Sequence, residues 1–185
     1  MQNFKGKSQA YKKFKQCKKE YMPFSTLQKV CSVSCSLEYV RKEREREFNL
    51  ETKKLKERIK TKREWVKEVQ VAFNAYIRER DAGHPCISCG RHHNGQYHAG
   101  HYKSVGAHPE LRFNEDNCSL QCSACNNYLS GNIVNYRPNL IAKIGIERLE
   151  KLESYNEPKE YTIDDLKKLK QLYKDKLKTL KARAQ

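Results

Sequence analysis

Apolar residues recur at helical spacing in two stretches of the chain. Residues three and four positions apart share one face of an α-helix, so each stretch predicts a helix with one packing face. The C-terminal stretch begins after Thr162, which forms a weak variant of a capping box with Asp165. Its stripe covers little more than two heptads, which favours a packing face over a dimer zipper. The stripes are Trp65, Val69, Phe73 and Tyr76/Ile77, then Leu166, Leu169, Tyr173, Leu177 and Leu180.

The rest of the pattern predicts four segments and an α+β fold class. Residues 36–82 contain no proline or glycine and are dense in Glu, Lys and Arg, which predicts one long helix. Its first part is polar nearly all round and would stand in solvent or lie along DNA. Residues 83–137 are rich in Gly, His and Asn with short apolar runs, which predicts a small hairpin-and-loop module. Residues 138–185 predict helices with a break at Gly145, and residues 1–35 form a basic lead.

The net charge of +16 is unevenly distributed along the chain. Residues 1–35 hold eight basic and one acidic side chain, whereas residues 83–132 hold three of each. A neutral centre between basic arms favours polyanionic partners, nucleic acid above all. The alternative is that lysine-rich faces only keep the helices soluble. No apolar run suggests a signal peptide or a membrane span, so we expect a cytoplasmic protein without a membrane partner.

Eight cysteines in a chain without an export signal indicate metal ligands rather than disulfides. Two Cys-x-x-Cys pairs can each turn two thiolates toward one ion, and together they complete a tetrahedral zinc site. The alternative is a set of buried thiols without metal. Cys118 lies outside this spacing and is expected to be a small packed residue. The predicted ligands of a structural zinc ion are Cys86, Cys89, Cys122 and Cys125.

Two histidines between the cysteine pairs have no role in a closed four-cysteine site. On an extended strand His98 and Gly100 would share one face, with His101 on the other. Asn126 follows Cys125 directly, so a zinc ion would fix its backbone. A histidine could activate water as a general base, while the amide oxygen and a second group hold a hard cation at a phosphate. The alternative is that both histidines cap loops and bond to the backbone.

The central motif resembles the HNH, or ββα-metal, nucleases in their zinc-stapled form, and is similar to the phage recombination endonuclease VII family. A more extensive resemblance, from about Trp65 to the C-terminus, is to the lambdoid phage NinG (Rap) recombination proteins. It implies a ββα-metal core flanked by a long basic N-terminal helix and C-terminal helices. The resemblance is carried by Gly100-His101, Asn117 and Leu120-Gln121-Cys122-x-x-Cys125-Asn126, and by "VAFNAYIRERDAGHPCISCG", "AGHY", "HPELRFNEDN", "SGN" and "YRPNLIAKIG".

The resemblance implies a role for each matching residue. His101 would be the general base, and Asn117 would steady the loop that carries it. Asn126 would bind a catalytic divalent metal, Mg²⁺ or Mn²⁺. Relatives have an aspartate where this chain has His98, and Gly100 replaces the acidic ligand that usually precedes the base. Histidine also ligates divalent metals but prefers transition metals to Mg²⁺, which leaves the identity of the metal open.

Two further positions depart from the pattern of the relatives. Leu129 stands where a basic residue is common, which leaves Lys103, Arg112 and Arg137 as candidates for phosphate contacts. Relatives begin with Cys-x-x-Cys and Cys-x-x-x-Cys, whereas this chain has Phe14 at the first of these positions. An incomplete second zinc site would therefore remain, consisting of Cys17, Cys31 and Cys35.

From the resemblance we expect a phage or prophage recombination protein that cuts branched DNA, such as Holliday junctions and D-loops, in the cytoplasm of the bacterial host. Symmetric junction cleavage would favour a homodimer, and other phage recombination proteins are candidate partners. Two alternatives stay open: a recombination accessory protein that holds junctions without cutting them, and a generic HNH endonuclease acting on duplex DNA. Intact His101 and Asn126 argue against the first alternative, while Gly100 and His98 argue for it.

Overall fold

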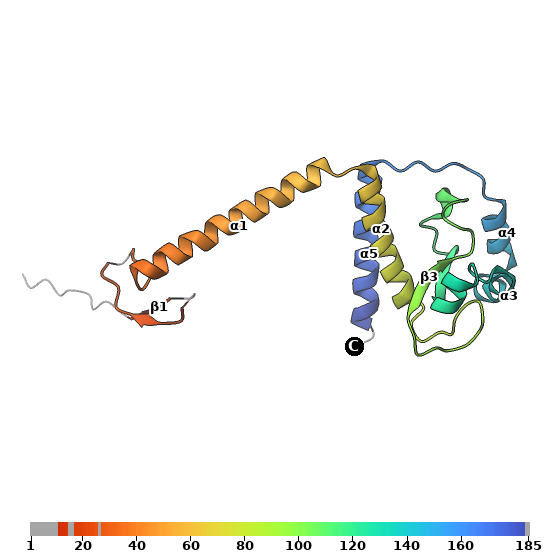
Figure 1. The fold of residues 1–185 in the computed structure, drawn as a ribbon, viewed down its shortest axis with the longest axis horizontal. Coiled ribbons are helices and arrows are strands. Elements are labelled where there is room, and N and C mark those ends of the chain that lie inside the picture. Colours follow the sequence, from red (N-terminus) through yellow and green to blue (C-terminus); the bar gives the residue numbers. More distant parts are fainter. Residues whose placement is uncertain (1–10, 15–16, 26, 184–185) are drawn as a thin grey trace, which may run out of the picture. The chain divides into compact units, whose positions relative to one another are not determined.

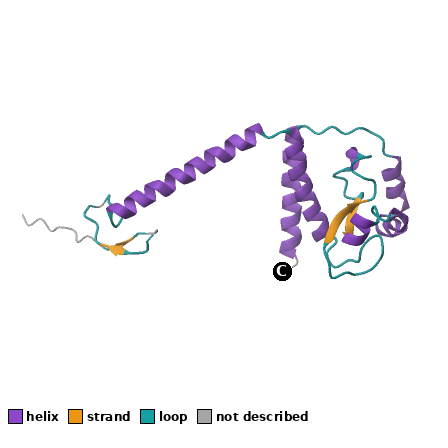
Figure 2. Ribbon diagram, viewed as in Figure 1, coloured by secondary structure: helices purple, strands orange, loops and turns teal. Residues whose placement is uncertain are grey.

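The computed structural model of the protein describes residues 11–14, 17–25 and 27–183. The chain divides into two compact units, residues 1–60 and residues 61–185 (Figure 1). The predicted α+β class is confirmed, because helices accompany two small antiparallel sheets (Figure 2). Within the described ranges, no helix combines the length and the apolar character needed to cross a membrane.

The first unit consists of a small hairpin and a long helix. Strand β1 (Lys12–Lys13) pairs antiparallel with β2 (Glu20–Tyr21). Helix α1 (Val33–Ile59) begins after Ser32, whose hydroxyl accepts a hydrogen bond of 3.2 Å from the backbone N–H of Cys35. None of the residues of α1 is buried, which agrees with a sequence that is polar nearly all round. Its stability therefore depends on capping and on opposite charges one turn apart rather than on a core face.

The prediction of one helix over residues 36–82 is wrong, because two helices occupy this stretch. The backbone leaves helical geometry at Lys60 (φ −58°, ψ 129°). Thr61 then caps α2 (Lys62–Arg80): its hydroxyl accepts a hydrogen bond from the N–H of Glu64, and the Glu64 carboxylate accepts one from the N–H of Thr61. Thr61 and Glu64 have the spacing of a capping box in the sequence. No proline or glycine accompanies them, however, so composition alone does not indicate that the helix is interrupted here.

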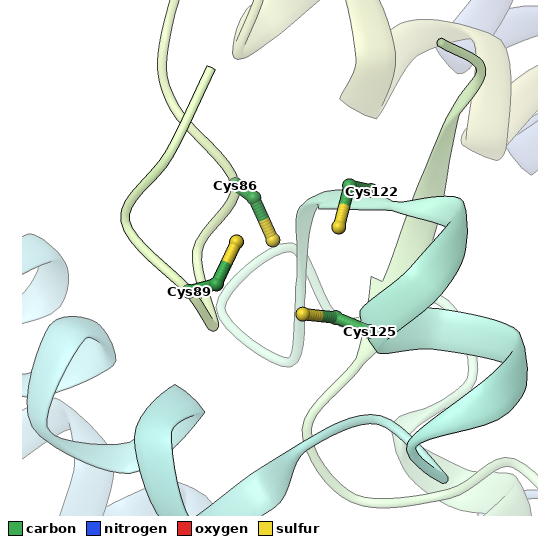
Figure 3. Close-up of side chains that lie close together, drawn as sticks. All are labelled: Cys86, Cys89, Cys122 and Cys125. Carbon is green, nitrogen blue, oxygen red and sulfur yellow. The ribbon is translucent and has the colours of Figure 1, made fainter. Parts of the chain in front are cut away.

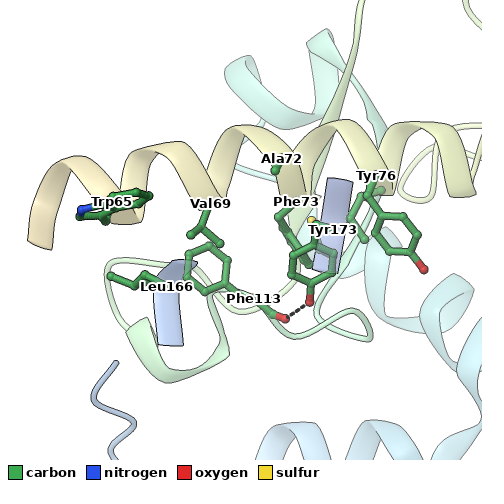
Figure 4. Close-up of a cluster of buried hydrophobic side chains, with 10 residues drawn as sticks. Trp65, Val69, Ala72, Phe73, Tyr76, Phe113, Leu166 and Tyr173 are labelled. Carbon is green, nitrogen blue, oxygen red and sulfur yellow. Dashed lines mark hydrogen bonds between the residues drawn. The ribbon is translucent and has the colours of Figure 1, made fainter. Parts of the chain in front are cut away.

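The core of the second unit lies between α2 and α5 (Ile163–Arg183) (Figure 4). Phe73 is fully buried, with its ring centroid 4.9 Å from that of Tyr173 and 5.9 Å from that of Phe113. The Tyr173 hydroxyl donates a 3.0 Å hydrogen bond to the carbonyl of Phe113. Both predicted apolar stripes face this core, so both are confirmed as packing faces. The predicted capping box of α5 is present as well, formed by Thr162 and Asp165.

A two-stranded hairpin packs against this core. Strand β3 (Tyr97–His101) pairs antiparallel with β4 (Cys118–Cys122), which confirms the predicted hairpin. The loop between the strands contains one short 3₁₀ turn, η1 (Pro109–Leu111). Ala99 and Cys118 lie in the core formed by α2 and α5, and Cys118 is fully buried, as expected for a small packed residue.

Two short helices form a second apolar cluster next to the hairpin. Helix α3 (Ile133–Ile144) ends at Gly145 (φ +84°), and α4 (Ile146–Ser154) starts immediately afterwards. The predicted break at Gly145 is confirmed. Its physical reason is the positive φ, which glycine adopts readily and which residues with a side chain disfavour. Tyr136 of α3 is fully buried and donates a 3.0 Å hydrogen bond to the carbonyl of Gly100. The hairpin is therefore tied to α3 through its backbone.

Replacing Phe73 with alanine should lower the free energy of unfolding by about 3–5 kcal/mol, because it removes a ring that contacts two other rings in the core. Urea unfolding of the metal-loaded protein measures the change. Val71→Ala, in the same helix at a position that is 70% exposed, is the matched control and should have little effect. Equal losses in the two variants would show that the interface between α2 and α5 is not the core of this unit.

Candidate functional site

Four cysteine sulfurs converge at one end of the hairpin. Two come from the loop that follows α2, one from the last residue of β4, and one from η2 (Ala124–Tyr128), a single π-helical turn. Their sulfur atoms all lie within 4.8 Å of one another and point toward a common centre (Figure 3). Four converging thiols, three of them buried, suit a tetrahedral metal ion such as zinc. The four residues are Cys86, Cys89, Cys122 and Cys125.

The backbone around the first cysteine pair forms a tight turn. The N–H of Cys86 donates to the carbonyl of Arg91 at 3.0 Å, and the N–H of Gly90 donates back to the carbonyl of Cys86 at 2.8 Å. Gly90 has a positive φ of +67°, which allows the chain to reverse there. The N–H of Ile87 donates to the carbonyl of Leu120 at 2.9 Å. This turn is therefore fixed to β4 by a backbone bond as well as by its thiols.

Polar side chains surround the sulfur cluster. The Asn132 amide donates to the sulfur of Cys125 at 3.6 Å. The Nε2 atom of His93 lies 3.2 Å from the sulfur of Cys89, the most exposed of the four cysteines. Hydrogen bonds of this kind orient thiolate ligands and reduce their excess negative charge. His93 was not singled out in the sequence, although its position four residues after Cys89 is the signal that could have indicated it.

His101 faces the core of the second unit. It pairs across the sheet with Cys118, and its Nδ1 atom lies 3.9 Å from the Cys118 sulfur. Its Nε2 atom lies 3.0 Å from the carbonyl of Arg112, an acceptor that requires the proton to be on Nε2. Burial lowers the pKa of His101 below its ordinary value. The ring is therefore neutral near pH 7, and Nδ1 is the nitrogen that can accept a proton.

His98 lies on the opposite face of β3, as strand alternation predicts, and pairs across the sheet with Gln121. Two atoms here are buried without a hydrogen-bond partner among the residues that the structure describes: Nε2 of His98 and Oε1 of Gln121. A side chain at Gly100 would place its Cβ 2.0 Å from Oε1 of Gln121. The amide of Gln121 thus fills the space that an acidic residue at position 100 would need.

Asn117 holds the ends of the loop between the two strands. It is fully buried, and its Oδ1 accepts from the N–H of Lys103 at 2.7 Å. Its amide donates to the carbonyls of Lys103 and Leu111, at 3.0 and 3.2 Å. Because Arg112, the partner of His101, belongs to the same loop, Asn117 indirectly fixes the His101 ring. This geometry suits the loop-steadying role that the resemblance implies for Asn117.

Asn126 lies in η2 and is half-buried. Its amide donates to the side-chain oxygen of Asn127 at 2.7 Å. Across the described part of the chain, no hydrogen bond joins Asn126 to His98 or His101. The structure therefore places His101 and Asn117 at the two ends of one loop, but it places the two histidines on opposite faces of β3.

The three basic candidates differ in how far they are already engaged. Arg137 is exposed and binds Glu153 through two nitrogen–oxygen contacts of 2.9 and 3.1 Å. Together with the Tyr102 hydroxyl, it lowers the pKa of Glu153 to about 2. The Arg112 guanidinium reaches the Gln70 side chain at 3.4 Å, and Lys103 is half-buried. Arg137 would have to leave Glu153 in order to bind a phosphate.

A buried charge network was not predicted from the sequence. Asp81 is 3% exposed and accepts hydrogen bonds from the N–H of Leu120 at 3.0 Å and from Nζ of Lys143 at 2.6 Å. Arg80 binds both carboxylate oxygens of Asp81 and also the carbonyl of Cys118. This network connects the end of α2 to β4 and α3. Arg80 and Asp81 are neighbours, but their partners in β4 and α3 are far away in the sequence, so no local pattern could have indicated the network.

The three N-terminal cysteines also converge. The sulfurs of Cys17, Cys31 and Cys35 lie within 4.8 Å of one another, and those of Cys17 and Cys31 are 3.3 Å apart. All three are partly exposed thiols. The set predicted as an incomplete metal site is thus assembled in the first unit, with Phe14 buried in the same hairpin.

An NMR titration should give His101 a pKa below 6.5, because burial favours its neutral form. His101→Gln identifies its signal. Since the pKa is lowered on folding, the contribution of His101 to the free energy of unfolding is complete above pH 6.5 and is lost as the pH falls through the lower, folded-state pKa. A pKa at or above 6.5 would contradict a neutral ring held between Arg112 and Cys118.

Comparison with known proteins identifies the family. The profile described as "Bacteriophage Lambda NinG protein" matches residues 6–183. Curated relatives named "Protein ninG" come from Escherichia phage lambda (46% identical over 123 residues, 66% of this chain and 60% of the relative), Salmonella phage P22 (45%, with 66% and 61%) and Escherichia phage 933W (44%, with 66% and 61%). The match thus spans about 60% of the length of these relatives. No solved structure matches. Because the profile covers almost all of the sequence, this chain belongs to the phage NinG family, as its motifs indicated.

Proposed function

We propose that this chain is a phage recombination protein that cuts branched DNA by metal-assisted phosphodiester hydrolysis. The observation that carries the proposal is the fixed, neutral His101 at the end of β3 opposite the four-cysteine cluster, with Nε2 bound to the Arg112 carbonyl and Nδ1 in a long contact of 3.9 Å with the Cys118 thiol. In this proposal β3, β4 and the helical turn η2 form an HNH-like ββα-metal core. The preference for branched over linear DNA rests on the resemblance of the motifs.

The four-cysteine cluster is proposed to hold structural zinc. Thiolates are preferred zinc ligands, and a site with four protein ligands is closed to substrate. The residues fit the ion, because their sulfurs already converge and the loop after α2 is joined to β4 by a backbone hydrogen bond from Ile87 to Leu120. The ion would therefore fix the position of Asn126, which directly follows Cys125.

His101 is proposed to accept the proton of the attacking water through Nδ1. A neutral imidazole with one nitrogen bound to a carbonyl is oriented and in the correct protonation state for this task. The contact of Nδ1 with the Cys118 thiol is long, at 3.9 Å, and would have to give way to water. Asn117 contributes by holding the loop that carries Arg112.

His98 and Asn126 are proposed to hold a catalytic divalent ion, Mg²⁺ or Mn²⁺. The unpartnered Nε2 of His98 and Oε1 of Gln121 support a cation on this face of the hairpin, because a buried acceptor without a partner is costly. Such an ion supplies a Lewis acid for the phosphate. His98 and His101 lie on opposite faces of β3, which argues against direct contact of both with one phosphate and counts for the second candidate function.

The basic residues are proposed to bind phosphates without reading the base sequence. The net charge of +16 and a helix α1 with no buried residues leave many cationic side chains available to a polyanion. Lys103 and Arg112 belong to the loop around His101 and would contact the phosphates nearest the site. Binding through charge of this kind weakens steeply as salt rises.

A protein that holds junctions without cutting them is the second candidate function. It is favoured by the absence of a carboxylate at position 100 and by the contacts that already engage both nitrogens of His101. The two candidates predict the same DNA binding. They differ in whether phosphodiester bonds are broken and in whether His101 is required.

Cys122→Ser should release one equivalent of zinc and unfold residues 61–185, because a structural zinc ion supplies folding free energy directly. Metal analysis and circular dichroism of the purified full chain measure both effects. Cys118→Ala, a buried cysteine of the same strand outside the cluster, should retain the zinc. Folded wild-type protein without zinc, purified without chelators, would refute the site.

His101→Ala should lower the rate of junction cleavage by about 10²–10⁴-fold, the usual effect of losing a positioned base. Cleavage of a four-way junction is measured with Mn²⁺, and binding of the same junction is measured in parallel. Binding and zinc content should not change. His92→Ala, an exposed histidine in the same unit, should cleave like wild type. Full activity of the His101→Ala protein would exclude this mechanism.

A further inference from the structure

Two backbone hydrogen bonds in the N-terminal hairpin match two bonds in the first cysteine turn of the second unit. The N–H of Phe14 donates to the carbonyl of Lys19 at 3.0 Å, and the N–H of Lys18 donates to the carbonyl of Phe14 at 2.8 Å. The same two bonds join Cys86 with Arg91, and Gly90 with Cys86.

The backbone dihedrals agree with these bonds. Lys18 has a φ of +57°, and Gly90, at the equivalent position, has a φ of +67°. A positive φ is uncommon for a residue other than glycine and is kept where the turn requires it. Phe14 therefore occupies the position that the first cysteine ligand, Cys86, has in the other turn, and Cys17 occupies the position of Cys89.

The remaining thiols of this unit complete a three-ligand group. Cys31 precedes the N-cap of α1, and Cys35 lies in the first turn of this helix. Their sulfurs and that of Cys17 lie within 4.8 Å of one another. Among the described residues of the first unit, no carboxylate joins these three thiols as a possible metal ligand. All six histidines lie beyond residue 60, so none of them belongs to this unit.

Phe14 has a packing role in place of a ligand role. Its side chain is 6% exposed, and its ring centroid lies 6.1 Å from that of Tyr39 in an edge-on arrangement. Tyr39 belongs to α1, one turn after Cys35. An aromatic contact thus joins the turn to the helix where a fourth metal–sulfur bond would otherwise do so.

We propose that Cys17, Cys31 and Cys35 bind one thiophilic divalent ion, zinc, and leave its fourth coordination position to water or a small exogenous thiol. A zinc site with three protein ligands keeps an open position, whereas a site with four is closed. The ion in the first unit is therefore more exchangeable than the ion at the four-cysteine cluster. The proposal is independent of nuclease activity, because it concerns a different unit and a different set of thiols.

Cobalt substitution of the full chain under reducing conditions tests the proposal, because the Co²⁺ absorption bands distinguish four sulfur ligands from three. Wild type should bind two equivalents, one with each ligand set. Addition of 2-mercaptoethanol should shift only the bands of the three-sulfur site. Cys35→Ser should lose one equivalent together with that response, while the four-sulfur bands stay unchanged.

Phe14→Cys should convert the second site to four sulfur ligands and abolish its response to 2-mercaptoethanol. Phe24→Cys, which adds a thiol at a position 95% exposed in the same unit, is the matched control and should still respond. If Phe14→Cys disrupts the hairpin, wild type and Cys35→Ser still decide the question. Binding of one equivalent by wild type, or a disulfide between Cys17 and Cys31 in the reduced preparation, would overturn the proposal.

Discussion

The convergence of four thiols is the constraint on which the candidate site in residues 61–185 depends. Cys86 and Cys89 come from a loop, Cys122 ends a strand, and Cys125 lies in a short helical turn. Without a shared metal ion, holding four thiolates or poorly hydrated thiols this close together would cost folding free energy. A shared metal ion, as proposed, would convert this cost into folding free energy and would fix the residues that follow, Asn126 among them.

A second set of contacts positions the hairpin relative to the helices. Phe73 and Tyr173 bury one face of the strands, while the carboxylate of Asp81 binds Lys143 and the backbone of β4. Nε2 of His101 contacts the carbonyl of Arg112, and Asn117 bonds to the carbonyl of the preceding residue, Leu111. The orientation of His101 thus results from the packing and hydrogen bonding around it, and its pKa is lowered mainly by burial, with a smaller contribution from the nearby charge of Arg112.

Much of this arrangement could be predicted from local sequence. A Cys-x-x-Cys pair forms its turn within a few residues, and the stripes from Trp65 and from Leu166 need only helical spacing. The interruption between α1 and α2 is not evident from composition, because threonine and glutamate at capping-box spacing also occur within charged helices. The packing of Gln121 against Gly100 depends on the register between two strands, which no local pattern contains. The assembly of Cys17 with Cys31 and Cys35 likewise depends on how a hairpin meets a helix.

The central claim is that a phage NinG family protein cuts branched DNA with a divalent metal. Its most direct test is to incubate the zinc-loaded wild-type chain with an end-labelled four-way junction and with a linear duplex of the same sequence, supplying Mg²⁺, Mn²⁺ or Zn²⁺ separately. The account predicts cleavage near the branch point of the junction with Mg²⁺ or Mn²⁺, and much slower cleavage of the duplex. Tight binding of the junction without cleavage under any of the three metals would contradict it and favour the protein that only holds junctions.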